Sequence, residues 1–293
     1  MSAVSEAGSQ RLTLGGLAQR YGLDMEPGFI ANVTVTSIAD DVDSLSPGAL
    51  YIARTPSAIA SLPHAAQAGA YAALLPRSAR GRSETEGGDL PLLFGTLDER
   101  RLGDLASAIA GNPSNSMAVF AIAGEDRHAI AADVAALSDL LHLLGNPVAV
   151  ISADGSRSME RALDLSYPLG VLDMQRVLSV CAEDGVAAVI IALDPRTVAE
   201  SGLESVTMDV LGVERASGQT SIEGLRSQYG FVVDEDMRLA TPTSEARQLS
   251  LEAAMSNGRG VGEPLALAIS MVLDAGVRRN NVRSALRVSR ELR

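Results

Sequence analysis

The sequence contains no lysine, because arginine accounts for all 24 of its Lys and Arg residues. A chain without lysine forms no Schiff base, holds no carbamylated lysine between metal ions, and places no ammonium group on a bound phosphate. Its three histidines, at 64, 128 and 142, do not have the spacing of metal ligands. The sequence therefore does not predict an enzyme that uses a catalytic lysine or a metal ion held by histidines.

Cysteine and aromatic residues are also scarce. The single Cys181 allows no disulfide within the chain, and the apolar helical pattern around it predicts a buried, unreactive thiol. Tryptophan is absent, aromatic residues make up 3% of the chain, and the net charge is −12. Nucleic acid is not an expected partner, because its recognition relies on basic patches and on aromatic side chains that stack on bases.

Long apolar runs are missing as well. No stretch of the sequence approaches the roughly 20 consecutive apolar residues that span a bilayer, so we do not expect an integral membrane protein. Residues 1–10 have no basic region followed by an apolar core, which predicts a cytoplasmic protein without a secretory signal. Residues 1–11 are expected to form a disordered tail.

Apolar strand patterns alternate with helical patterns along the rest of the chain, which predicts an α/β protein. A boundary near Asn112-Pro113 separates a small N-terminal α/β domain, 12–112, from a second domain, 113–293, with a mainly parallel sheet flanked by helices. The second domain is expected to contain strands at 118–123, 147–152, 187–193 and 208–213, a hairpin formed by 231–233 and 238–240, and helices at 128–144, 174–182, 244–255, 263–274 and 280–292. Residues 152–158, SADGSRS, are expected to be a loop.

The strand expected at 118–123 leads into a loop and then into an alanine-rich helical pattern. This is the outline of a P-loop, G-x-x-G-K-[ST], in which backbone N–H groups and a lysine hold phosphates and a hydroxyl holds Mg²⁺. Arginine replaces the second glycine, histidine the lysine and alanine the hydroxyl residue, and two carboxylates stand where an anion would bind. The residues of this vestigial loop are Gly124, Glu125, Asp126, Arg127, His128 and Ala129.

Several segments, taken in order, resemble the Mur ligase family and within it the MurE branch. VTVTSIADDVDSLSPGALYIAR at 33–54 resembles the opening segment of the family, HAAQAGAYAALL at 64–75 a helix and strand of its first domain, and SYPLGVLDMQ at 166–175 its T-T-P-x-x-x-D-x-Q segment. Members are ATP-dependent ligases that add amino acids to the UDP-MurNAc peptide precursor of peptidoglycan. The resemblance implies a UDP-binding-like domain at 12–112 and an ATPase-like central domain at 113–293.

The departures from the family pattern fall on its functional positions. Asp41, Val42 and Asp43 stand in the family's D-S-R segment, Ala192 stands where its magnesium-binding glutamate is expected, and the loop at Gly124 lacks its phosphate ligands. The C-terminal ligase domain of the family is expected to be absent. We therefore predict a degenerate family member, a pseudoenzyme without cofactor or metal.

Three functions stay open from the sequence. The leading hypothesis is a scaffold or regulator that binds protein partners in cell-wall synthesis or cell division. The alternative is a sensor that binds a UDP-MurNAc peptide or a nucleotide without turnover, and the third is an enzyme completed by a partner chain. A candidate partner surface is the arginine stripe of the last helix, although such a stripe is also typical of a solvated helix. The stripe consists of Arg279, Arg283, Arg287 and Arg290.

Overall fold

The structure, a computed structural model, describes residues 12–81, 90–213, 221–235, 237–257 and 263–291. The chain divides into two compact units, Met1–Asn112 and Pro113–Arg293. This division falls between the two residues at which the sequence places a domain boundary. The tail expected at 1–11 lies outside the described residues. Within the described part of the chain, no helix is long and apolar enough to cross a membrane.

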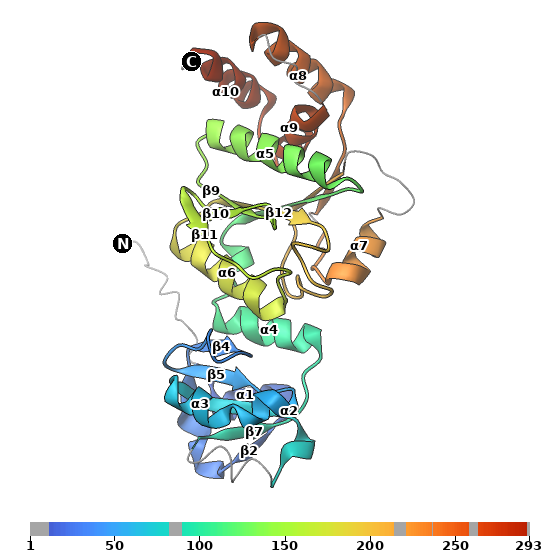
Figure 1. Cartoon of the computed structure of the whole chain (residues 1–293). Helices are drawn as coiled ribbons and strands as arrows, with labels where there is room; N and C mark the ends of the chain where they lie inside the picture. The colour runs from blue at the N-terminus through green and yellow to red at the C-terminus, as the bar shows by residue number, and fades with distance from the viewer. Residues whose placement is uncertain (1–11, 82–89, 214–220, 236, 258–262, 292–293) are drawn as a thin grey trace, which may run out of the picture. The chain divides into compact units, whose positions relative to one another are not determined.

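The smaller unit is built on a five-stranded sheet in the order β2-β7-β6-β5-β4 (Figure 1). The strands from β4 to β7 pair in parallel, and β2 pairs with β7 in the antiparallel direction. Tyr51 and Phe94 of this sheet are buried in one cluster with Leu62 and Ala65. The elements are β1 (Leu12–Thr13), α1 (Leu14–Tyr21), β2 (Asp24–Glu26), η1 (Gly28–Asn32), β3 (Thr34–Val35), β4 (Ser37–Ala39), β5 (Ala49–Ile52), α2 (Pro56–Ala60), α3 (Leu62–Gln67), β6 (Ala70–Leu75), η2 (Arg77–Ala79), β7 (Leu92–Phe94) and α4 (Glu99–Ile109).

The larger unit contains a seven-stranded sheet in the order β11-β10-β9-β12-β8-β13-β14. The five strands from β9 to β14 in this order pair in parallel, and β10 and β11 add an antiparallel edge. The elements are η4 (Pro113–Asn115), β8 (Ala118–Ala123), α5 (Arg127–Leu143), β9 (Val148–Ile151), β10 (Ser156–Ser158), β11 (Arg161–Leu163), α6 (Val171–Glu183), β12 (Ala188–Leu193), β13 (Val210–Val213), α7 (Ile222–Tyr229), β14 (Arg238–Ala240), α8 (Ser244–Asn257), α9 (Glu263–Asp274) and α10 (Arg279–Glu291).

Helices cover both faces of this sheet, with α5, α8, α9 and α10 on one face and α6 and α7 on the other (Figure 1). The strands are apolar at consecutive positions because alternate side chains enter different cores. Phe120 and Ile190 lie in the core against α5 and α9, whereas Val119 and Val189 lie in the core against α6. The predicted fold class, an α/β protein with a mainly parallel sheet flanked by helices, is therefore confirmed.

Local sequence signals explain where α5 begins and ends. Asp126 is its N-cap residue, and Gly145 follows its C-cap with a φ of 84°, in the left-handed region that ends helices. The helix was expected at 128–144, and it runs from Arg127 to Leu143 with Leu144 as its C-cap residue. Its neighbour α9 is buried on all sides from Ala266 to Val272, which explains the apolar sequence of that helix.

Two local predictions were wrong. Residues 231–233 and 238–240 do not form a hairpin, because β14 pairs in parallel with β13 and Val232 forms a parallel bridge with Thr207. Residues 152–158 are not entirely a loop, because 156–158 form β10 and pair with both β9 and β11. Both errors concern short segments whose pairing partners lie far away in the sequence or are themselves short.

Cys181 is fully buried in α6, as predicted, within the core between α6 and the sheet. Burial raises the pKa of its thiol to about 11, and a hydrogen bond with Ser158 offsets only part of that rise. Because the thiolate is the reactive form, this cysteine is unsuited to nucleophilic chemistry in the folded protein.

We expect Cys181 to react with iodoacetamide at pH 8 at least about 100-fold more slowly in the native protein than in guanidinium. The rise in its pKa from 9.0 to about 11 lowers the thiolate fraction by about that factor, and burial slows access further. Mass spectrometry of timed samples measures both rates. Equal rates in the two conditions would contradict the burial of this residue.

Candidate functional site

The vestigial loop joins the end of β8 to the start of α5 through three residues, Gly124, Glu125 and Asp126. The carboxylate of Asp126 accepts a hydrogen bond of 3.0 Å from the N–H of His128, so the side chain of the loop itself satisfies one of the free amide groups of α5. In a phosphate-binding loop such amides face the ligand. The helix terminus here carries its own negative charge.

The backbone of the loop does not adopt the left-handed conformations that only glycine tolerates easily. Neither Gly124 nor Arg127 has a φ in the left-handed region, so the arginine at the position of the second P-loop glycine is not strained. A Cβ added to Gly124 would meet only Ile130, at an ordinary contact distance of 3.4 Å. The loop thus keeps the path from strand to helix without the conformations that normally require glycine.

The residues of the loop are solvent-exposed from Gly124 to His128, and Ala129 is half-buried. The guanidinium Nε of Arg127 donates to Nε2 of His128 over 3.4 Å. The loop therefore presents two carboxylates and a guanidinium to solvent in the place where a lysine and a hydroxyl would be needed to hold a metal-bound phosphate.

A network of polar residues lies at the carboxyl ends of the neighbouring strands β9 and β12. The guanidinium of Arg196 donates to both carboxylate oxygens of Asp154, over 3.0 and 2.8 Å. These hydrogen bonds hold the pKa of Asp154 below its usual value, and Arg127 and His128 act in the same direction. Asp154 therefore lies among cations at the sheet edge that includes the loop, and Arg196 is already engaged by a carboxylate of the protein.

The loop after β12 is held by Asp194, which is buried. Its carboxylate accepts from the N–H groups of Arg196 (2.8 Å) and Thr197 (3.2 Å), and the hydroxyl of Thr197 accepts from the N–H of Ala153 over 3.0 Å. This connects the loops after β9 and β12. Sequence reasoning missed Asp154, Asp194 and Arg196 as a group, although each follows a strand end, where side chains of adjacent parallel strands meet.

Ala192, the position of the expected metal-binding glutamate, is 1% exposed and lies in the apolar core against α5 and α9. Phe120 and Ile130 belong to the same cluster. A carboxylate at this position would lose its hydration in apolar surroundings, which strongly disfavours the ionised form. Among the described residues, no group of three or more His, Cys, Asp or Glu side chains is placed to hold a metal ion.

The arginine stripe of α10 is partly engaged by α8. Arg279 pairs with Glu245 at 3.0 Å and Arg283 with Glu252 at 3.4 Å. Arg287 is exposed, and the side chain of Arg290 lies outside the described residues. Two of the four arginines thus help to hold α10 on α8, which reduces what the stripe offers to a partner.

The smaller unit has cavities at the carboxyl ends of β5 and β6, the place where open α/β sheets commonly bind ligands. Arg54 and Pro76 line both a cavity of about 100 Å³ and one of about 320 Å³. The guanidinium of Arg54 is shared between Glu99 at 2.6 Å and Asp40 at 3.6 Å. Asp41, in the altered D-S-R segment, accepts from the N–H of Ser44 and serves as a turn residue. Arg54 was not singled out from the sequence.

No protein-family profile and no curated protein match this chain. It is similar in structure to MurF from Acinetobacter baumannii, with 13% identity over 92% of this chain and 66% of that chain and a TM-score of 0.55. The UDP-N-acetylmuramoylalanyl-D-glutamyl-2,6-diaminopimelate–D-alanyl-D-alanyl ligase of the same organism gives 10% identity, 92% and 67% coverage and a TM-score of 0.54. A UDP-N-acetylmuramoyl-L-alanyl-D-glutamate–2,6-diaminopimelate ligase has 15% identity over 82% of this chain and 45% of that chain, with a TM-score of 0.43.

The two likenesses with TM-scores of 0.55 and 0.54 establish a Mur-ligase-like fold and no more, because the identities are low. They do not single out the MurE branch, which stays a prediction from the sequence. The chain spans 45% to 67% of the length of these solved ligases.

Replacing Gly124 by alanine should change the free energy of unfolding by less than about 1 kcal/mol, because neither φ nor space at this position requires glycine. The matched control is Gly202→Ala, whose Cβ would lie 2.6 Å from the carbonyl oxygen of Leu169 and should cost about 1 to 3 kcal/mol. Urea unfolding measures both. A large loss from Gly124→Ala would contradict the described loop.

The pair of Asp154 and Arg196 should stabilise the fold at neutral pH and lose this effect in acid. Because the pKa of Asp154 is lowered in the folded protein, its ionised form stabilises the fold above about pH 4, and this contribution disappears as the pH falls through the lowered value. Asp154→Asn should therefore be less stable than the wild type at pH 6, and the difference should vanish in acid. Asp139→Asn, at an exposed position, is the control. A difference that persists or grows in acid would contradict the pairing.

Proposed function

We propose that this protein is a non-catalytic relative of the Mur ligases that acts through protein contacts, as a scaffold or regulator in peptidoglycan synthesis or cell division. The observation that carries the proposal is the N-terminus of α5, where Asp126 caps the helix in the place of a phosphate. The proposal takes the biological setting from the fold, because a structurally similar ligase is named for its UDP-N-acetylmuramoyl peptide substrate.

The charges of the loop support this proposal, since they oppose the binding of a nucleotide. A carboxylate about 5 Å from a phosphate charge repels it by roughly 1 kcal/mol in bulk water and roughly 3 kcal/mol at an effective dielectric constant of 20. Glu125 and Asp126 both stand at this terminus, and solvent screens part of their effect because they are exposed. Arg127 offsets only part of the remaining charge.

The missing catalytic groups support it independently. Phosphoryl transfer depends on cations that neutralise developing charge, and the loss of one such group typically costs about 10² to 10³ in rate. This chain has no lysine anywhere, and the position expected for the metal-binding glutamate is a buried alanine, Ala192. Because these losses affect separate groups, substitution of one neighbouring residue does not compensate for all of them.

The second candidate, a sensor that binds a UDP-MurNAc peptide without turnover, is favoured by one feature of the smaller unit. Arg54 lines two cavities at the carboxyl ends of β5 and β6 and brings a cation to that edge. This cation is shared by two carboxylates, so a ligand anion has to compete with Glu99 and Asp40. We therefore rank the sensor below the scaffold.

The catalytic part of the proposal is tested by measuring phosphate release and ligation with ATP, Mg²⁺, UDP-MurNAc peptides and amino acids. We expect the wild type to match an Arg127→Ala, His128→Ala double variant, because neither protein has the groups that transfer a phosphoryl group. Turnover by the wild type above the double variant would overturn the proposal.

Calorimetry separates the two candidate functions. The scaffold proposal expects no heat with UDP-MurNAc peptides at millimolar concentration. Binding that is lost in Arg54→Gln and retained in Arg226→Gln, an exposed arginine of α7, would favour the sensor. Proximity labelling in the native cell then asks whether cell-wall or division proteins are enriched over a cytosolic control, and their absence would contradict the scaffold.

A further inference from the structure

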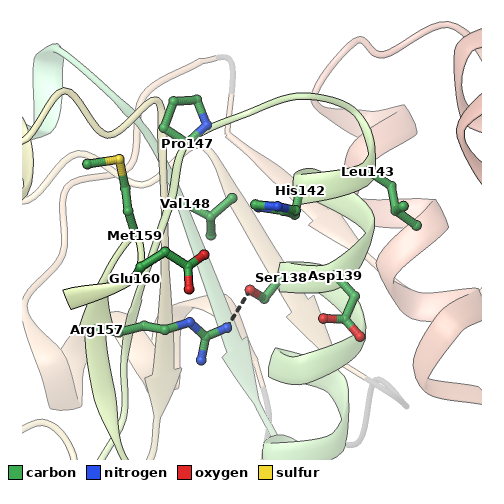
Figure 2. A pocket seen from close by; sticks show the side chains of 9 residues that line it. All are labelled: Ser138, Asp139, His142, Leu143, Pro147, Val148, Arg157, Met159 and Glu160. Carbon is green, nitrogen blue, oxygen red and sulfur yellow. Dashed lines mark hydrogen bonds between the residues drawn. The ribbon is translucent and has the colours of Figure 1, made fainter. Parts of the chain in front are cut away.

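The larger unit has a cavity that lies away from the vestigial loop. It has a volume of about 630 Å³ and lies between the second half of α5, the start of β9 and the turn from β10 to β11 (Figure 2). Pro147 and Val148 line it at the amino end of β9, whereas the loop at Gly124 follows the carboxyl end of β8. Because β8, β12 and β9 are parallel, the cavity and the loop lie at opposite edges of the sheet.

Arg157 supplies the main positive charge of this cavity. Its antiparallel pairing with Val150 places it on the α5 face of β10, and its guanidinium donates to Oγ of Ser138 over 2.8 Å. Ser138 is 4% exposed, so this hydrogen bond fixes the guanidinium against the floor of the cavity. Within the described part of the chain, no carboxylate pairs with Arg157, and most of its donors stay available.

Two carboxylates, those of Glu160 and Asp139, also line this cavity. Figure 2 shows the carboxylate of Glu160 and the ring of His142 directed into the space above the guanidinium of Arg157. Glu160 forms no ion pair with the described cations of the protein. A cation and an anion that are both unpaired therefore share one cavity, and Val148 and Met159 add apolar surface to its walls.

The turn that carries Glu160 is held in a conformation that costs energy. Met159 has a φ of 51°, in the region that disfavours a side chain. The turn is fixed in spite of this cost by a 2.9 Å hydrogen bond from the N–H of Met159 to the carbonyl of Val148, and by Ser158 and Arg161, which both donate to Asp184. Strain retained by surrounding bonds is typical of residues that shape a site.

We propose that this cavity binds a short zwitterionic peptide, with the ligand's carboxylate on Arg157 and its ammonium group on Glu160. A guanidinium held at one nitrogen can still accept a carboxylate through its remaining donors. The volume falls within the range of small-molecule pockets and exceeds what a single small amino acid fills. The site is independent of the vestigial loop, and its function does not depend on whether the loop binds a nucleotide.

The probe is alanylalanine, titrated into protein labelled with ¹³C at its methionine methyl groups, with the Met159 resonance assigned by Met159→Leu. We expect a saturable shift of this resonance with a dissociation constant in the millimolar range. N-acetyl-alanylalanine lacks the ammonium group and alanylalanine amide lacks the carboxylate, so each should bind at least about 10-fold more weakly, which corresponds to about 1.4 kcal/mol.

Substitutions test the assignment of each charge. Arg157→Gln and Glu160→Gln should each weaken the binding of alanylalanine about 10-fold or more, and Arg226→Gln and Glu223→Gln, at exposed positions of α7, should leave it unchanged. Met159→Gly suits the left-handed turn and removes only the apolar wall, so it should weaken binding severalfold without unfolding the hairpin. Binding to Arg157→Gln, Met159→Gly and the α7 controls is measured by calorimetry, because Met159→Gly removes the NMR reporter. Binding to Glu160→Gln is measured by the Met159 resonance.

Two results would overturn the proposal. One is the absence of any saturable shift up to 50 mM alanylalanine, a concentration chosen as roughly ten times the expected dissociation constant. The other is equal binding of alanylalanine and its N-acetyl form, which would identify a site for anions only. Should Arg157→Gln fail to fold, the capped peptides and Glu160→Gln still decide the question, because the side chain of Glu160 forms no hydrogen bond or ion pair with the described residues.

Discussion

The parallel pairing of β8 with β12 and β13 is the constraint on which the larger unit depends. Six residues of β12 and four of β13 are in register with β8, and the carboxylate of Asp209 accepts from the N–H of Val119 over 2.7 Å at the start of that register. Because the strands are parallel, their carboxyl ends meet at one edge. That edge brings together the loop at Gly124, Asp154 and Arg196, and it leaves the opposite edge to the cavity at Arg157.

At this edge of the sheet, carboxylates of the protein itself engage a helix N-terminus and an arginine. A helix N-terminus needs a partner for its free amides, and either a bound phosphate or a capping side chain satisfies this need. Asp126 meets it for one amide, that of His128, from within the chain, and Asp154 likewise occupies Arg196. At this amide, therefore, a side chain of the protein takes the place that a bound ligand has in a phosphate-binding loop.

Long apolar strands and the helices between them could be predicted from the sequence, because burial on both faces leaves continuous apolar runs such as Ala118–Ala123 and Ala188–Leu193. Short strands could not. β10 is polar on both faces. Ser158 donates to Asp184 on one face, and Arg157 donates to Ser138 on the other. β14 has its partner in β13 across α7, so its local pattern resembles half of a hairpin. The pairs of Arg279 and Arg283 with α8 likewise depend on packing that no local pattern records.

The position of the candidate site could be predicted from the sequence, but the hydrogen bonds between its residues could not. The position of the loop follows from the strand and helix around Gly124, whereas Asp154 and Arg196 come together only because β9 and β12 are neighbours in the sheet. The central claim, that α5 is capped by its own carboxylate and holds no phosphate, is tested most directly by an NMR titration. With ¹⁵N-labelled protein and MgATP at several millimolar, the account predicts no saturable shift of the amides of Gly124 and His128, and a saturable shift at both would contradict it.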